Sequence, residues 1–114
     1  MAYEFNPKTS QVTEKSLADF LEAKIDQNLT SVPGIGANGV EKLYAVGITN
    51  TLQLIGQFLL LRENDMNTPA HCTAFYKWLA ESGISGHRGT IVDCIAQKTN
   101  MLIPGIYDPS EFDD

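Results

Sequence analysis

The chain has 114 residues, of which 43% are hydrophobic, so its size and composition fit one folded domain rather than a disordered segment. The longest apolar run, residues 58–61, is far too short to cross a bilayer, and no basic-then-apolar leader begins the chain. We therefore expect no membrane insertion and no signal peptide, and a nuclear or cytoplasmic location. The net charge of −6 argues against strong long-range attraction to nucleic acid.

The first predicted segment is a polar arm, residues 1–15, which lacks periodicity and is expected to be flexible. Ser16 and Asp19 then resemble a capping box. Apolar residues at helical spacing follow, namely Leu17, Phe20, Leu21, Ile25 and Leu29. This pattern predicts an amphipathic helix over residues 17–29.

A tight turn follows, with the sequence Val32-Pro33-Gly34-Ile35-Gly36. Proline sets the entry to such a turn, and glycine permits positive φ and close approach of a ligand. A second helix is predicted over 37–46, with Gly47 as its left-handed C-terminal residue. The unpaired N–H groups at the start of a helix point in the same direction, and the helix dipole adds partial positive charge there. We therefore expect an anion site at this turn.

Thr49 or Asn50 is expected to cap a third helix over 51–61, which is apolar on almost every face. One small core cannot easily cover all of that surface, so part of it is expected to meet another subunit or partner. The residues predicted for this surface are Leu54, Gly56, Phe58, Leu60 and Leu61. A fully buried central helix is the alternative.

Thr68 and Pro69 mark the start of a fourth helix that is expected to end at Ser82-Gly83. Thr90 is expected to start a fifth helix over 91–99, and Ile103 to Ile106 to form an ordinary turn. The aromatic residues Phe58, Phe75 and Trp78 follow helical spacing, which favours core packing over base stacking. We therefore predict a compact all-α fold with five helices in one domain, residues 16–100, followed by an acidic tail, residues 101–114.

No catalytic or metal site is predicted. Cys72, Cys94, His71 and His87 are the candidate metal ligands, but they lack the spacing of a zinc site. No base is placed by sequence beside either thiol, and no nucleophile motif is present. We predict a non-enzymatic protein that needs no cofactor.

The helix, Pro-Gly-Ile-Gly turn and helix form a helix-hairpin-helix pattern. A longer set of residues is similar to the barrier-to-autointegration factor family: Gly34-Ile35-Gly36, Lys42-Leu43, Gly47, Gly56-Gln57-Phe58-Leu59, Leu61, Phe75, Trp78-Leu79 and the loop around Arg88. The resemblance covers about residues 29–97. It implies a helical homodimer that binds and bridges double-stranded DNA without sequence preference, acting in chromatin and nuclear organisation with nuclear-envelope or chromatin proteins as partners.

The same resemblance implies the DNA-phosphate residues Gly34, Ile35, Gly36, Asn38, Gly39, Lys42 and Arg88. The chain departs from the family at several charges: Glu41 stands beside Lys42, Glu63 follows Arg62, and the tail holds Asp108, Glu111, Asp113 and Asp114. With few cations near the hairpin, we expect binding through backbone amides. The alternative function is a protein-interaction adaptor with the same fold that has lost strong DNA binding.

Overall fold

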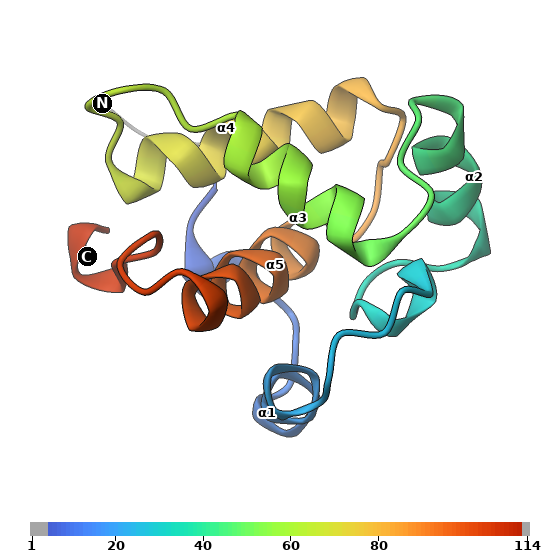
Figure 1. The fold of residues 1–114 in the computed structure, drawn as a ribbon, viewed down its shortest axis with the longest axis horizontal. Helices are drawn as coiled ribbons and strands as arrows, with labels where there is room; N and C mark the ends of the chain where they lie inside the picture. The colour runs from blue at the N-terminus through green and yellow to red at the C-terminus, as the bar shows by residue number, and fades with distance from the viewer. Residues whose placement is uncertain (1–4, 113–114) are drawn as a thin grey trace.

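The computed structural model describes residues 5–112, which form five α-helices and three short 3-10 helices, with no strand among them. The α-helices are α1 (Glu14–Glu22), α2 (Ala37–Ala45), α3 (Thr51–Leu60), α4 (Thr68–Glu81) and α5 (Arg88–Leu102). The 3-10 helices are η1 (Pro7–Thr9), η2 (Leu29–Ser31) and η3 (Pro109–Glu111). The predicted five-helix all-α fold is therefore confirmed (Figure 1).

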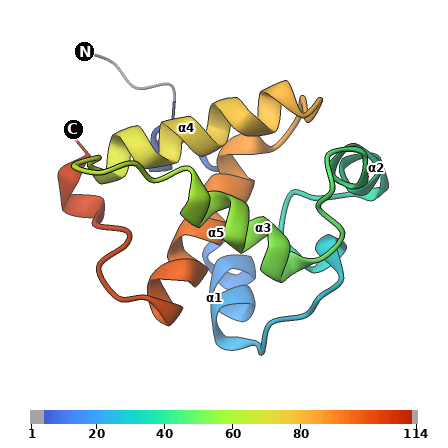
Figure 2. The same ribbon diagram turned by 45° about the horizontal axis from the view of Figure 1, so that its top comes forward.

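Helix α5 lies at the centre of the molecule and packs against α1, α3, α4 and η1 (Figures 1 and 2). Its residues Ile91, Val92, Ile95 and Ala96 are fully buried, which explains why this helix shows little amphipathic pattern in sequence. The prediction placed this helix over 91–99 with Thr90 at its start, whereas it begins at Arg88, after His87 as N-cap, and continues to Leu102. Helix α2 lies at one edge of the molecule in both views.

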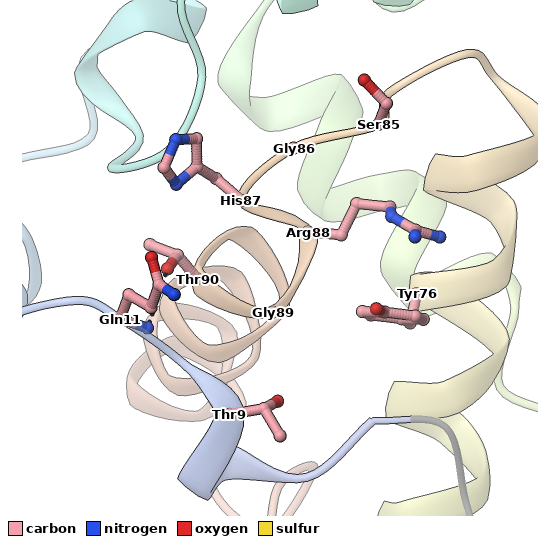
Figure 3. Close-up of a pocket in the computed structure, with 9 residues that line it drawn as sticks. All are labelled: Thr9, Gln11, Tyr76, Ser85, Gly86, His87, Arg88, Gly89 and Thr90. Carbon is pink, nitrogen blue, oxygen red and sulfur yellow. Dashed lines mark hydrogen bonds between the residues drawn. The ribbon is translucent and has the colours of Figure 1, made fainter.

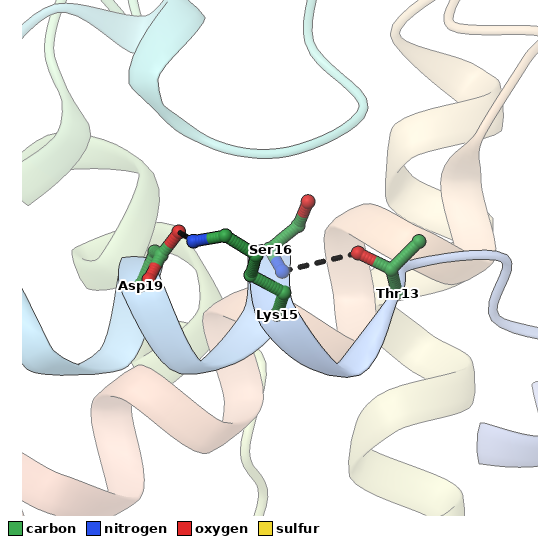
Figure 4. A network of polar contacts seen from close by, with 4 residues as sticks. All are labelled: Thr13, Lys15, Ser16 and Asp19. Carbon is green, nitrogen blue, oxygen red and sulfur yellow. Dashed lines mark hydrogen bonds and ion pairs between the residues drawn. The ribbon is translucent and has the colours of Figure 1, made fainter.

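Helix α1 differs from the predicted 17–29 segment, because it begins at Glu14 and ends at Glu22. The Thr13 hydroxyl, rather than Ser16, caps it by accepting from the Ser16 amide at 3.1 Å (Figure 4). Asp19 instead pairs with Lys15 at 2.9 Å, one helical turn apart.

The C-terminal end of α1 is fixed from a distant part of the chain. The buried Lys98 ammonium donates to the carbonyls of Phe20, Leu21 and Ala23 at 3.0, 2.9 and 2.5 Å. It thereby satisfies carbonyls that a helix end leaves unpaired. The chain then runs through a turn in which Asp26 accepts from the Asn28 amide at 2.8 Å and leads into η2. The element before the hairpin is therefore this 3-10 turn and not a long helix.

The later helix ends agree closely with the sequence. Asn50 caps α3 by accepting from the Gln53 amide at 2.8 Å. Asn67 caps α4, one residue before the predicted Thr68, by accepting from the Ala70 amide at 2.9 Å. Gly47 and Gly83 have φ of +87° and +97° where α2 and α4 end, as expected of C-terminal glycines.

The segments at both ends are packed onto the helical body. Phe5 is only 1% exposed, and its amide donates to the Thr73 hydroxyl at 3.4 Å, so the described part of the arm is anchored where flexibility was expected. Near the other end, Tyr107 is buried and Glu111 accepts from the Thr68 amide at 2.9 Å. The turn over 103–106 is confirmed, with Gly105 at φ +97°. Residues 1–4 and 113–114 of the predicted arm and tail lie outside the described residues.

Candidate nucleic-acid interface

The hairpin turn between η2 and α2 is built as its sequence predicts. The Ile35 amide donates to the Val32 carbonyl at 3.1 Å, and Gly34 between them has φ of +97°. Proline followed by a positive-φ glycine fits a type II turn. Gly36 then serves as the N-cap of α2 in an extended conformation (φ −105°), and no side chain caps the helix.

The absence of a side-chain cap leaves the start of α2 with unused donors. The first helix amide in use is that of Val40, which donates to the Gly36 carbonyl at 3.0 Å. Within the described residues, the amides of Gly36, Ala37, Asn38 and Gly39 form no hydrogen bond with other protein groups. These donors and the helix dipole make the start of α2 favourable for an anion.

The hairpin turn lies directly against the start of α5. A Cβ on Gly34 would come within 3.0 Å of Ile91 Cγ1 and within 3.2 Å of both the Cβ and the carbonyl oxygen of His87. Only glycine permits this approach. At the start of α5, the Ile91 amide donates to the His87 carbonyl at 3.0 Å. Two helix starts are thus held side by side.

Three surface depressions surround this junction. The hairpin depression, of about 240 Å³, lies between α2 and the loop before α5 and includes Gly34, Ile35, Gly36, Asn38, Gly39, Lys42 and His87. The arm depression, of about 520 Å³, lies between the hairpin turn and the start of α1 and includes Thr13, Ser16, Thr30 and His87. The Arg88 depression, of about 310 Å³, includes Thr9, Gln11, Tyr76, His87 and Arg88.

The electrostatic character of this surface differs from that of the whole chain. The ionisable side chains lining the three depressions are those of Lys42, Tyr76, His87 and Arg88, and no carboxylate lines any of them. The net charge of −6 is therefore carried elsewhere. Helix η3, within the acidic tail, lies at the opposite end of the molecule from α2 (Figures 1 and 2). Locally, the junction presents amides, hydroxyl groups and cations.

The predicted phosphate residues are only partly brought together. Six of them line the hairpin depression, whereas Arg88 lines its neighbour. The Arg88 guanidinium carbon lies 4.5 Å from the centre of the Tyr76 ring, and Figure 3 shows this side chain extending away from the hairpin. The pairing with an aromatic ring holds the charge at a defined position beside the start of α5.

Lys42 lines the hairpin depression and also packs against the end of α4. Its aliphatic carbons pack on Gly83, where an added Cβ would lie 3.1 Å from Lys42 Cδ. Gly83 ends helix α4, and a cation near a helix C-terminus is favourable. The stem is thereby supported while the side chain remains exposed.

The predicted partner surface on α3 needs correction. Leu54 and Phe58 are 0% exposed within the single chain, because they form the core with Phe75 and the stacked ring of His71, 3.9 Å from Phe58. They are therefore not available to a partner. Leu61 is half-buried, whereas Gly56 is exposed and Leu60 is 77% exposed. With the exposed Leu52, Gly56 and Leu60 follow one another every four residues along one face of α3, and sequence spacing alone had not singled out Leu52.

The two cysteines and His71 are buried away from the depressions. Burial raises the pKa of both the Cys72 and the Cys94 thiol to about 12, and both thiols are free. Burial also lowers the pKa of His71, whose Nε2 lies 2.6 Å from the Phe58 carbonyl oxygen. Among the described residues, no three or more His, Cys, Asp or Glu residues are grouped to hold a metal ion.

Within residues 5–112, no helix has the length and apolar character needed to cross a bilayer.

No curated protein and no solved structure matches the chain. The model of one family, described as barrier to autointegration factor, matches residues 8–102, which is most of the chain and includes the hairpin and all five α-helices. The chain therefore belongs to the barrier to autointegration factor family.

Proposed function

We propose that this protein binds double-stranded DNA through its phosphates, without reading base sequence. The observation that carries this proposal is the pair of adjoining helix starts, where Gly34 packs against His87 and Ile91. The amides of Gly36, Ala37, Asn38 and Gly39 point to an anionic ligand, and the phosphates of DNA offer that charge whatever the base sequence. Lys42 and Arg88 supply charge on the two sides of the junction.

The proposed contacts explain why an acidic protein is suited to this role. Backbone amides and helix dipoles attract phosphate at short range without any net positive charge. No carboxylate lines any of the three depressions, so a phosphate seated in them meets no negatively charged lining residue. We expect weak long-range steering and binding that is strongest at low salt.

Substitution at Gly36 tests the proposal. An added Cβ at Gly36 meets no atom within 4 Å, so Gly36→Glu is compatible with the fold while it places a carboxylate over the free amides. Ala45→Glu, at the exposed far end of the same helix, introduces the same charge as a control. In an anisotropy titration with mixed-sequence duplex at low salt, Gly36→Glu should weaken binding at least tenfold, and the control less than twofold. Equal binding by both variants would contradict the proposal.

We also propose that two copies associate through the exposed face of α3. Leu52, Gly56 and Leu60 form an apolar stripe with a glycine at its middle, where another helix can approach closely. A dimer built on this face would carry two hairpin sites and could bridge two duplexes, a role consistent with chromatin and nuclear organisation. Leu60→Glu should convert the dimer to a folded monomer, as measured by light scattering. If the wild-type protein is itself a monomer, the proposed association through α3 is refuted.

The alternative is an adaptor that binds another protein through exposed apolar side chains of α3 and α5. The exposed residues Leu60, Met101 and Leu102 favour it, because each is more than half exposed in the single chain. An adaptor of this kind would be indifferent to Gly36→Glu and would not bind duplex DNA. A nuclear location and the lack of catalytic activity stay predictions for either function.

A further inference from the structure

Aromatic rings bring the two ends of the described chain together. The centre of the Phe5 ring lies 5.8 Å from that of Phe112 and 6.4 Å from that of Tyr76. The ring of Tyr107 lies 6.1 Å from that of Phe112. We call these four residues, Phe5, Tyr76, Tyr107 and Phe112, the terminal aromatic cluster. Aromatic pairs at such distances attract one another beyond the area that they bury, so the cluster ties the N-terminal arm to the C-terminal segment.

The segment after α5, residues 103–112, is itself fixed to the start of α4. The Asp108 amide donates to the Thr68 hydroxyl at 3.0 Å, and the Thr68 amide donates to a Glu111 carboxylate oxygen at 2.9 Å. A carboxylate at a helix start is stabilised by the helix dipole. Helix η3 lies beside the start of α4 in both views (Figures 1 and 2). Phe112 is therefore held in place by the backbone on which it is carried.

The arm that Phe5 anchors continues into two of the three surface depressions. Phe5 is 1% exposed, so the cluster encloses this end of the arm. Further along, the Gln11 amide donates to the Thr90 hydroxyl at the start of α5 at 3.1 Å. Thr9 and Gln11 are exposed and line the Arg88 depression, and Gln11 also lines the arm depression (Figure 3). One end of the arm is thus held by the cluster, while the other lies in the candidate interface.

Tyr76 connects the cluster with the Arg88 depression by a second route. Its ring contacts Phe5 and also lies 4.5 Å from the Arg88 guanidinium carbon. Phe5 and the segment 103–112 lie outside residues 8–102, which the family model matches. The cluster therefore joins segments outside the matched region to side chains of the candidate interface.

We propose that the segment 103–112 positions the N-terminal arm for DNA binding, with Phe112 as the positioning residue. This inference rests on the DNA-binding function proposed above. Phe112 lines none of the three depressions, so it acts through Phe5 and Tyr76. A flexible arm loses conformational entropy when a ligand orders it, and this loss lowers affinity. Because the cluster orders the arm before DNA arrives, Gln11 is already in place beside the depressions.

The test compares four full-length proteins: wild type, Phe112→Ala, Phe112→Tyr and Trp78→Ala. Phe112→Ala removes the ring that packs on Phe5, whereas Phe112→Tyr keeps a ring of the same shape. Trp78→Ala is the matched control, because it removes another half-buried ring, which stacks on Phe75 at 6.0 Å and lines none of the depressions. Hydrogen exchange measures the protection of the arm amides, and anisotropy with mixed-sequence duplex at low salt measures affinity. Urea denaturation confirms that each variant is folded and measures its stability.

In Phe112→Ala, the amides of Phe5, Thr9 and Gln11 should exchange about tenfold faster than in wild type, because their hydrogen bonds open without unfolding of the helices. Duplex binding should weaken about threefold, since DNA must then order the arm. Phe112→Tyr should match wild type in both measurements. Trp78→Ala should leave the arm exchange and the duplex affinity unchanged even though it lowers stability.

Arm exchange that is unchanged in Phe112→Ala would overturn the inference, and so would faster exchange without a loss of affinity. An equal loss of affinity in Trp78→Ala would also overturn it, because affinity would then follow stability rather than the order of the arm. In these three cases, DNA binding by wild type still stands. If wild type binds no duplex, the proposed function fails, and the positioning role of Phe112 fails with it.

Discussion

The junction between the hairpin and α5 can be tested by substituting alanine at Gly34. Two costs follow from the structure. The backbone there has φ of +97°, and a left-handed conformation costs an alanine about 1–2 kcal/mol. The added Cβ also lies 3.0 Å from Ile91 Cγ1 and 3.2 Å from the backbone oxygen of His87, and overpacking of this kind costs about 1–3 kcal/mol.

The two terms together predict that Gly34→Ala lowers the free energy of unfolding by about 2–5 kcal/mol. Gly36→Ala is the matched control, because that residue has φ of −105° and an added Cβ meets nothing within 4 Å. Alanine is a poorer N-cap than glycine, so the control should lose less than about 1 kcal/mol. Urea denaturation followed by circular dichroism measures both values. Equal losses for the two variants would refute the described contact between the hairpin and α5.

Three further predictions concern the core. Phe58→Ala should lose about 3–5 kcal/mol of stability, because this fully buried ring packs on His71 and Phe75; a loss below 1 kcal/mol in urea denaturation would place it at the surface. Burial lowers the pKa of His71 in the folded state, so the stability that neutral His71 contributes is present above the unfolded pKa and is lost as pH falls below about 6.5. The variant His71→Phe should therefore lose less stability than wild type between pH 7 and pH 5. An equal loss in both proteins would exclude His71 as its source. Cys72 and Cys94, with pKa raised to about 12, should not react with a thiol reagent at pH 8 until the protein unfolds, and rapid native labelling would contradict their burial.

The parts of the fold that local chemistry decides were predictable from sequence. The turn at Pro33 and Gly34, the cap at Asn50 and the helix-ending glycines Gly47 and Gly83 depend on residues close together in the chain. The end of α1 was not predictable in this way. It is set by Lys98, which lies 77 residues beyond Leu21. The helix predicted from hydrophobic periodicity alone therefore extends beyond the observed end of α1.

In the candidate site, too, the features set by neighbouring residues were predictable, and those set by distant residues were not. The glycines and helix-start residues of the hairpin depression could be assigned from the turn itself. Which charged side chains line the depression depends on how α2 meets the loop before α5. The place of His87 at this junction could not be predicted, because it depends on a left-handed backbone and on contact with Gly34, a residue distant in the chain. Leu54 and Phe58 were assigned to a partner surface because α3 is apolar all round, and only packing shows which face is buried.

The salt dependence of duplex binding tests the central claim most directly. Two duplexes of unrelated sequence should bind with the same affinity, since the proposed contacts reach phosphates only. The cations lining the depressions are Lys42 and Arg88. The logarithm of the binding constant should therefore fall with the logarithm of salt concentration with a slope of about −2 per site. Preference for one sequence, or no binding of either duplex at micromolar protein, would contradict the account.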